Sequence, residues 1–325
     1  MLSFLDVGDR LRGYDATMRE DTYFFRSSCP FCGADSLSAK PFMRSHPAAE
    51  ELDFGEHKIF YSGYASQRVF FTYYQCLSCS GLFCRTYFTQ VQLGELYAHQ
   101  GENNASVPVA CRERTMQDYF SLLQRHSRLD GNFLEIGPDT GLFTRCCRRQ
   151  GRFEQFWLYE PNVEVHETLR NNMEGTSFTL RESPYVRSDI PPENLSTAVL
   201  IHVLDHLLDV KATLDDVRHN LIRGGILFVV THDVASLLAR VMGRRWPPYT
   251  LQHPQLYSPT SMRRSLEGHG FEILEIMKCT NYFPMAYLFR SLLAVLGVKI
   301  GNMTCSESSG IAIKLGNIAT VARKL

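Results

Sequence analysis

Residues 133–143 read Phe-Leu-Glu-Ile-Gly-Pro-Asp-Thr-Gly-Leu-Phe, and this stretch decides the fold. The apolar run up to Ile136 predicts a buried strand, and Gly137 and Gly141 mark a tight turn that leads into a helix. Glycine lacks a Cβ, so the backbone of such a turn can approach a nucleotide-like ligand closely. The alternative is a strand-turn-helix unit of any α/β protein, in which the glycines only shape the turn.

A second short strand, Leu158–Tyr159, ends in the carboxylate of Glu160, about twenty residues after the turn. An acidic side chain at this position can accept hydrogen bonds from both hydroxyls of a ribose. The spacing Glu135-x-Gly-x-x-x-Gly141 lacks the Gly-x-Gly-x-x-Gly fingerprint of a dinucleotide site. The two strands together therefore indicate a nucleotide-like ligand of a different kind.

Strand and helix patterns alternate through the C-terminal two thirds of the chain, after an amphipathic helix predicted over residues 112–129. Apolar runs predict strands at 132–136, 156–159, 178–180, 197–201 and 226–231, and helices at 140–150, 163–171 and 209–222 fall between them. Residues 271–277 and 318–323 predict two closing strands. This alternation predicts an α/β fold with a parallel, doubly wound sheet.

These segments resemble motifs of the class I S-adenosylmethionine-dependent methyltransferases. The glycine turn resembles their motif I, and residues 199–209, 221–227 and 257–271 resemble three further segments, so the likeness covers roughly residues 115–325. It implies a Rossmann-like, mostly parallel sheet and S-adenosylmethionine as the cofactor. The expected cofactor-binding residues are Glu135, Gly137, Pro138, Asp139, Gly141, Glu160, Pro161 and His202.

The resemblance also assigns roles within that set. Gly137 and Gly141 are expected to flank the methionine part of the cofactor, and Glu160 to bind the ribose. Many family members carry glycine where this chain has Asp139. Aspartate tolerates a left-handed backbone, but its charge could weaken binding of the cofactor carboxylate, which leaves open a cofactor-binding scaffold without activity.

Four of the ten cysteines form two C-x-x-C pairs, Cys29/Cys32 and Cys76/Cys79. Two such pairs predict a closed, four-thiolate zinc site of structural type. Strands at 69–74 and 81–83 would flank the second pair, and residues 76–97 resemble the zinc ribbon that precedes some bacterial small-molecule and sugar methyltransferases. The alternatives are a redox pair, or replacement of one thiolate by His46, His57 or Cys84.

Charge and length limit the remaining classes of protein. Lys plus Arg and Asp plus Glu each total 34, so no net field attracts nucleic acid or an anionic membrane. The arginines at 145, 148, 149 and 152 are expected to lie on a solvated helix face, and the alternative is a local basic patch. No signal peptide is evident at the start of the chain, so a cytoplasmic protein is expected. The length of 325 residues suits two domains.

Three histidines are the candidate general bases, because imidazole titrates in a suitable range. His202 and Asp205 follow the strand at 197–201, and His232 and Asp233 follow the strand at 226–231, where reacting groups gather in open α/β sheets. His253 lies on a proline-rich loop, residues 244–254, that should cross the same rim. The structural alternatives are that His202 only shapes the pocket, that His206 caps or packs a helix, and that Trp246 covers the core.

The sequence thus predicts a zinc-binding domain over residues 1–100 and a methyltransferase domain over residues 112–325. Lid segments are expected near 243–258 and 281–300. The apolar stretch 282–298 suits a lid, a homodimer face or an interfacial helix, and is too short for a convincing transmembrane span. The expected acceptor is a sugar, a nucleotide-linked sugar or a secondary metabolite, and the alternative is an RNA methyltransferase.

Overall fold

The structure is a computed structural model that describes residues 23–61, 69–97, 107–295, 310–314 and 316–325. The first residues, Cys305 and residues 296–300 of the expected second lid lie outside these ranges.

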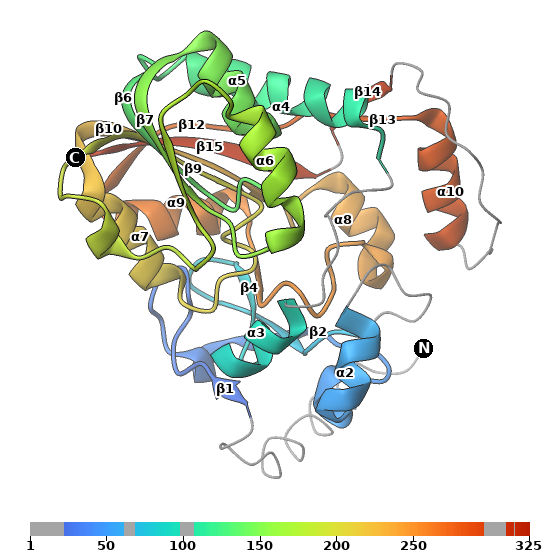
Figure 1. The fold of residues 1–325 in the computed structure, drawn as a ribbon. Coiled ribbons are helices and arrows are strands. Elements are labelled where there is room, and N and C mark those ends of the chain that lie inside the picture. The colour runs from blue at the N-terminus through green and yellow to red at the C-terminus, as the bar shows by residue number, and fades with distance from the viewer. Residues whose placement is uncertain (1–22, 62–68, 98–106, 296–309, 315) are drawn as a thin grey trace.

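A seven-stranded sheet forms the centre of the C-terminal part, in the order β12-β15-β10-β9-β6-β7-β8 (Figure 1). Its strands are β6 (Asp130–Ile136), β7 (Arg152–Tyr159), β8 (Phe178–Arg181), β9 (Leu195–Ile201), β10 (Leu221–His232), β12 (Phe271–Lys278) and β15 (Asn317–Lys324). Strands β6 to β10 pair in parallel, and β15 is antiparallel to both of its neighbours. The predicted doubly wound, mostly parallel sheet is confirmed.

Helices cover both faces of this sheet, as Figure 1 shows. The helices are α4 (Val109–Gln124), α5 (Leu142–Gln150) and α6 (His166–Asn172) on one face, and α7 (Val210–Asn220) and α9 (Pro259–Gly268) on the other. Along β6, Phe133 packs toward the first group, and Leu134 and Ile136 pack toward the second. Burial on both faces explains why the strands read as continuous apolar runs.

Most predicted element boundaries lie within five residues of the observed ones, but the strand predicted at 69–74 is observed only at Tyr73–Gln75. The end of the helix predicted at 209–222 also differs, and the reason is instructive. Asp209 caps α7 through the amide of Ala212 at 2.9 Å, as its position before the helix requires. The helix ends at Asn220, however, and β10 already begins at Leu221. The register of β10 against β9 shifts between Leu221 and Ile226, so the glycine pair forms an irregularity within the strand.

A second sheet of four strands, β11-β4-β3-β2, joins distant parts of the chain. Strands β2 (Lys40–Met43), β3 (Tyr73–Gln75) and β4 (Leu82–Cys84) come from the N-terminal part, together with α2 (Phe54–Tyr61), α3 (Gln90–Tyr97) and the pair β1 (Phe24–Phe25) and β5 (Thr86–Tyr87). Strand β11 (Gln255–Leu256) comes from the expected first lid and pairs with β4. The loop before it is therefore anchored on the N-terminal sheet.

Buried polar contacts strengthen this junction. The guanidinium of Arg26 donates to the carbonyl of Pro254 at 3.1 Å, to the carbonyl of Leu208 at 3.0 Å and to Oε1 of Gln255 at 2.7 Å. The hydroxyl of Tyr73 donates to the carbonyl of His253 at 2.6 Å. Trp246 packs in the same apolar cluster as the N-terminal strands, as expected for a side chain that covers a core.

The remaining elements lie beside these two sheets. They are α8 (Leu237–Met242), the pair β13 (Asn281–Phe283) and β14 (Ile311–Ile313), α10 (Met285–Val295), and the short 3-10 helices η2 (Ser36–Ser38), η3 (Ala49–Glu51), η4 (Val163–Val165), η5 (Arg187–Asp189) and η6 (Gly243–Arg245). The apolar stretch from residue 282 thus begins as a strand and continues as α10. Within the described residues, none of the helices has the length and apolar character needed to span a membrane.

Candidate active site

The glycine turn after β6 has the backbone that its sequence predicts. Gly137, Asp139 and Gly141 all adopt positive φ, at 68°, 50° and 77°. A Cβ on Gly137 would lie 2.8 Å from Cγ2 of Val203, and a Cβ on Gly141 would collide with Leu169. Both glycines are therefore required by conformation and by space, and Asp139 accepts the left-handed backbone.

The carboxylate of Glu160 lies beside this turn at the end of β7. Its Oε2 accepts a hydrogen bond from the amide of Asp139, and its Oε1 accepts one from the amide of Asn162, both at 2.9 Å. Burial raises the pKa of Glu160, and the two amides oppose that shift. Each carboxylate oxygen keeps further acceptor capacity, so the side chain can also bind two ribose hydroxyls.

Glu135 lies deeper than the rest of the turn. Its side chain is 1% exposed and accepts a hydrogen bond from the hydroxyl of Thr144 in α5. Burial raises its pKa from 4.5 to about 8, so the carboxyl group is mostly protonated at neutral pH. Pro138 is buried in the turn, and Pro161 is exposed after Glu160.

Replacement of Glu135 by glutamine should change the pH dependence of stability. Between pH 4.5 and about 8 the native chain holds a proton that the unfolded chain releases, so wild-type stability falls as pH rises through this window. The loss is about 1.4 kcal/mol per pH unit. Thermal unfolding should show a smaller decline for Glu135→Gln than for wild type, whereas Glu154→Gln, an exposed change on β7, should follow wild type. Equal pH profiles for all three proteins would contradict the buried protonated carboxyl.

Four histidines form a cluster at the carboxyl ends of β9 and β10. Ring centroids are 4.7 Å apart for His202 and His232, 4.9 Å for His232 and His253, and 4.6 Å for His206 and His253. The structure thus brings the three candidate bases together and adds His206, which the sequence analysis expected to cap or pack a helix. The only hint in the sequence that His206 joins this cluster was its position on the same loop as His202 and Asp205.

Asp205 holds one of these histidines. It is fully buried, and its Oδ2 accepts hydrogen bonds from the backbone amide of His232 at 3.0 Å and from the ring Nδ1 at 2.7 Å. Burial raises the pKa of Asp205 to about 6 and lowers that of His232 to about 4. In this arrangement Nδ1 of His232 carries the proton, and Nε2 carries the lone pair.

His253 is fixed through its other ring nitrogen. Its Nδ1 donates to the carbonyl of Pro248 at 2.7 Å, so the lone pair lies on Nε2. Burial, and then the nearby His232, lower the pKa of His253 to about 4. The main chain of His253 is held by Tyr73 of the N-terminal sheet. The ring is therefore neutral at physiological pH and is positioned from both sides.

The glycine turn and the histidine cluster lie at the same end of the sheet, where the parallel strands β6, β9 and β10 have their carboxyl ends. Strand β9 lies between β6 and β10, and Ile136 pairs with Leu200 while Ile201 pairs with Val230. Val203, which follows His202, packs against Gly137. A ligand in the glycine turn and a molecule at the histidines can therefore meet at this end of the sheet.

The two cysteine pairs converge on one point. Sγ of Cys29 lies 3.7 Å from that of Cys79, Sγ of Cys32 lies 3.6 Å from that of Cys76, and all four sulfur atoms lie within 4.8 Å of one another. Tetrahedral zinc with Zn–S bonds of about 2.3 Å requires S···S separations of about 3.8 Å. The donor set and its spacing therefore fit zinc.

The alternative ligands of this cluster have other roles. Nε2 of His57 contacts the carbonyl of Ala49 at 2.8 Å, and Sγ of Cys84 donates to the carbonyl of Phe71 at 3.6 Å. His46 is exposed. The cluster itself packs on the C-terminal part of the chain, where Phe31 contacts Tyr257 edge to face with ring centroids 4.8 Å apart.

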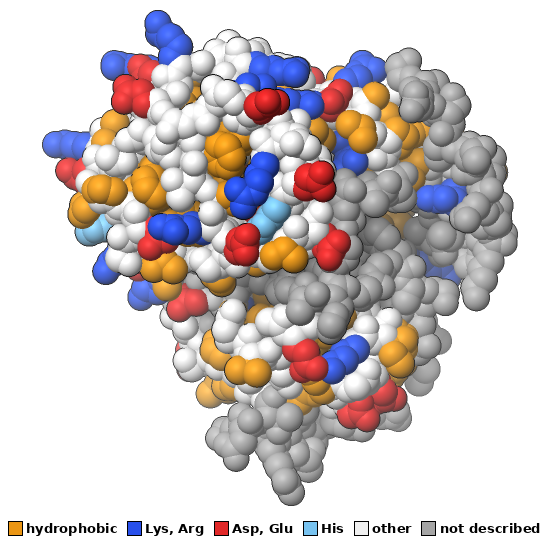
Figure 2. All heavy atoms as spheres, viewed as in Figure 1, with side chains coloured by type: hydrophobic (Ala, Val, Ile, Leu, Met, Phe, Trp, Pro, Cys, Tyr) orange, Lys and Arg blue, Asp and Glu red, His pale blue; other side chains and the backbone are white. Residues whose placement is uncertain are grey.

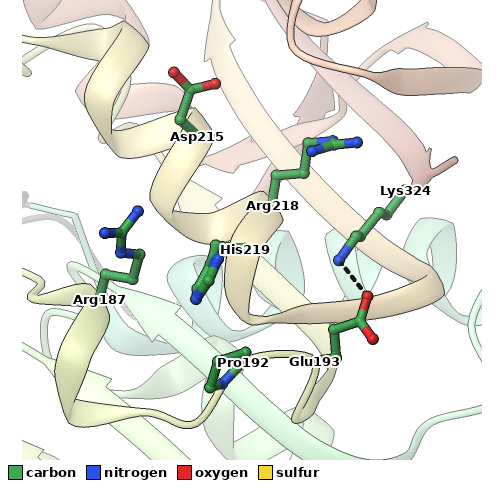
Figure 3. Close-up of a pocket in the computed structure, with 7 residues that line it drawn as sticks. All are labelled: Arg187, Pro192, Glu193, Asp215, Arg218, His219 and Lys324. Carbon is green, nitrogen blue, oxygen red and sulfur yellow. Dashed lines mark hydrogen bonds and ion pairs between the residues drawn. The ribbon is translucent and has the colours of Figure 1, made fainter.

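A separate hollow of about 500 Å³ lies at the other end of the sheet. Figure 3 shows its lining residues Arg187, Pro192, Glu193, Asp215, Arg218, His219 and Lys324, with Lys324 paired to Glu193. Glu193 precedes β9 and His219 lies in the last turn of α7, so the hollow is at the amino ends of the parallel strands. None of the expected site residues lines it.

The fold, together with the glycine turn and histidine cluster at the carboxyl ends of the parallel strands, defines a class I methyltransferase. The model of a protein family described as a methyltransferase domain matches residues 110–276, which is just over half of the chain. The chain belongs to this methyltransferase domain family and is an enzyme of that class. No curated protein matches the sequence.

Similar solved structures share low sequence identity with the chain. One is a chain from the complex between the Haloferax volcanii Trm112 methyltransferase activator and a methyltransferase. It has 13% identity, the match covers 65% of this chain and 91% of that chain, and the TM-score is 0.48. An S-adenosylmethionine dependent methyltransferase from Mesorhizobium loti has 13% identity, 64% and 97% coverage and a TM-score of 0.45. A SAM-dependent methyltransferase from Methanosarcina mazei has 15% identity, 63% and 97% coverage and a TM-score of 0.41.

Proposed function

We propose that the protein transfers a methyl group from S-adenosylmethionine to a small-molecule acceptor such as a sugar, a nucleotide-linked sugar or a secondary metabolite. The observation that carries this proposal is that the glycine turn, with Glu160, lies beside the histidine cluster at the carboxyl ends of the parallel strands. S-adenosylmethionine supplies an activated methyl group and a leaving group that needs no proton. Gly137, Gly141 and Glu160 would hold it, and zinc would have only a structural role at the four cysteines.

His253 is the base that we assign to this reaction. Its Nδ1–H is committed to Pro248, so Nε2 is available to accept a proton from an acceptor hydroxyl. The loop that carries it is fixed by Tyr73 and β11, which keeps the ring at the strand ends. His202 and His232 would contact the acceptor from β9 and β10.

The surface favours a small acceptor over RNA. Figure 2 shows basic and acidic side chains interspersed over the described part of the visible face. Of the arginines near α5, Arg145 pairs with Glu113, and Nη1 of Arg148 donates to the carbonyl of Glu174 at 2.7 Å. Binding of a phosphate backbone requires clustered, available cations, and two of the four arginines at positions 145–152 are engaged in these contacts.

The proposed ribose contact predicts the effect of removing Glu160. Hydrogen bonds to a carboxylate contribute roughly 1.5–3 kcal/mol each, so Glu160→Ala should weaken S-adenosylmethionine binding at least about tenfold, because 1.4 kcal/mol is one decade. Calorimetry measures this directly. Glu154→Ala, an exposed change on the same strand, should bind like wild type. Unchanged affinity in folded Glu160→Ala would show that the ribose assignment is wrong.

A labelled-methyl assay tests the acceptor class. The protein is incubated with S-adenosylmethionine carrying a radioactive methyl group, once with a metabolite extract and once with total RNA. We expect label in the small-molecule fraction, at a rate that falls with Glu160→Ala. Label in RNA, with a steep dependence on salt, would favour the RNA methyltransferase instead. Cofactor binding without transfer to either pool would favour the inactive scaffold.

A further inference from the structure

The histidine cluster contains a group of possible ion ligands that is distinct from the four cysteines. One ligand atom each from His202, Asp205 and His232 lies within 4.8 Å of the other two. His202 and Asp205 come from the loop after β9, and His232 is the last residue of β10. Two imidazoles and one carboxylate are a donor set that leaves coordination positions open, and it suits divalent transition metals more than Mg²⁺.

Two of these side chains present buried polar atoms without a partner. Oδ1 of Asp205 and Nδ1 of His202 are buried and make no hydrogen bond. Asp205 is fully buried, and within the described parts of the chain no lysine or arginine hydrogen-bonds to it. An unpaired carboxylate oxygen in such a place costs free energy. A bound cation would satisfy both atoms at once.

The backbone holds His202 in a strained position beside Asp205. Its φ is 54°, a left-handed backbone conformation that is unfavourable for a residue with a Cβ. Its amide nevertheless donates to the carbonyl of Val230 at 2.8 Å, and its Nε2 lies 3.5 Å from the side-chain amide of Asn317. When Nδ1 binds an ion, Nε2 carries the proton, and the Asn317 amide can turn its oxygen toward it.

We propose that His202, Asp205 and His232 bind a divalent transition-metal ion at the acceptor side of the active site. Nδ1 of His202, Oδ1 of Asp205 and one ring nitrogen of His232 would be the ligands. The role of the ion rests on the proposed function: an acceptor oxygen bound at an open position would become more acidic and lose its proton to His253 more readily. The binding itself does not depend on that function.

Cobalt titration of the zinc-loaded, full-length protein tests the site. Co²⁺ bound by nitrogen and oxygen has weak visible absorption bands, and Co²⁺ that entered the cysteine cluster would have intense sulfur-to-metal charge-transfer bands. We expect one equivalent of Co²⁺ to bind with the weak spectrum. Asp205→Asn and His232→Ala should each weaken this binding at least about 100-fold, since even the loss of a group that only orients a ligand costs roughly 10–100-fold.

The chain offers a matched control in the pair of His269 and Asp215. Nδ1 of His269 lies 2.7 Å from Oδ1 of Asp215, the same separation as in the buried pair, but Asp215 is half exposed, and among the described residues no third metal-ligating group joins these two. His269→Ala should therefore bind Co²⁺ like wild type. His202→Gln provides a third test of the site if Asp205→Asn or His232→Ala fails to fold, as judged by circular dichroism.

The outcomes separate this site from the proposed function. Absence of a second ion, or a second ion unaffected by the Asp205, His232 and His202 variants, overturns the metal site. Calorimetry with S-adenosylmethionine and the labelled-methyl assay are run on the same preparations. If methyl transfer persists without a second ion, only the metal site is wrong. If the ion binds as expected and no methyl group is transferred, only the proposed function is wrong.

Discussion

Replacement of His253 by alanine is expected to lower the rate of methyl transfer by about 10²–10⁴, the usual contribution of a positioned general base. The affinity for S-adenosylmethionine should stay near that of wild type, because the glycine turn follows β6 and Glu160 follows β7, which lie two and three strands away from β10. Single-turnover rates at saturating cofactor, with the acceptor found in the labelled-methyl assay, measure the effect. Loss of the lone pair on Nε2 is the physical cause.

His219→Ala is the control for this variant, because His219 is exposed in the hollow at the opposite end of the sheet (Figure 3). It should transfer methyl groups at the wild-type rate. An acceptor that is already nucleophilic, such as an amine, needs no base. Uniformly small effects for His253→Ala, His232→Ala and His202→Ala would remove histidine from the mechanism and leave positioning as the source of the rate.

Replacement of Cys76 by serine is expected to release the ion from the cysteine cluster and to lower the melting temperature by at least about 10 °C. A structural zinc site contributes several kcal/mol or more to folding, and 1 kcal/mol corresponds to roughly 2–4 °C in a domain of this size. The effect should be large here because Cys29, Cys76 and Cys79 lie in the same apolar cluster as the helix α9 residues Met262 and Leu266. Elemental analysis and thermal unfolding measure the two changes.

Cys146→Ser provides the comparison for this variant, since Cys146 is a half-buried free thiol on α5, away from the cluster. It should keep the zinc and unfold near the wild-type temperature. Zinc-free wild-type protein with an unchanged melting profile would show that the four cysteines do not hold a structural ion.

The sequence predicted the parts of the fold that local patterns determine. The glycine turn, the alternation of strands and helices, and the paired cysteines each depend on neighbouring residues, so spacing alone revealed them. Strand β11 could not be predicted, because it has two residues and pairs through a distant partner. Asp205 and His206 follow β9 in the sequence, but their place against His232 and His253 depends on the anchored loop.

Strand β11 also has a consequence for how the protein folds while it is synthesised on the ribosome. Its residues Gln255 and Leu256 pair with Phe83 and Leu82. The N-terminal sheet therefore cannot be completed until most of the chain has been synthesised, although its other strands emerge early. Contacts between such distant positions slow folding, and until β11 is synthesised the unpaired side of β4 can pair with other chains and aggregate. Early capture of a metal ion by the four cysteines would hold the nascent segment in shape during that interval.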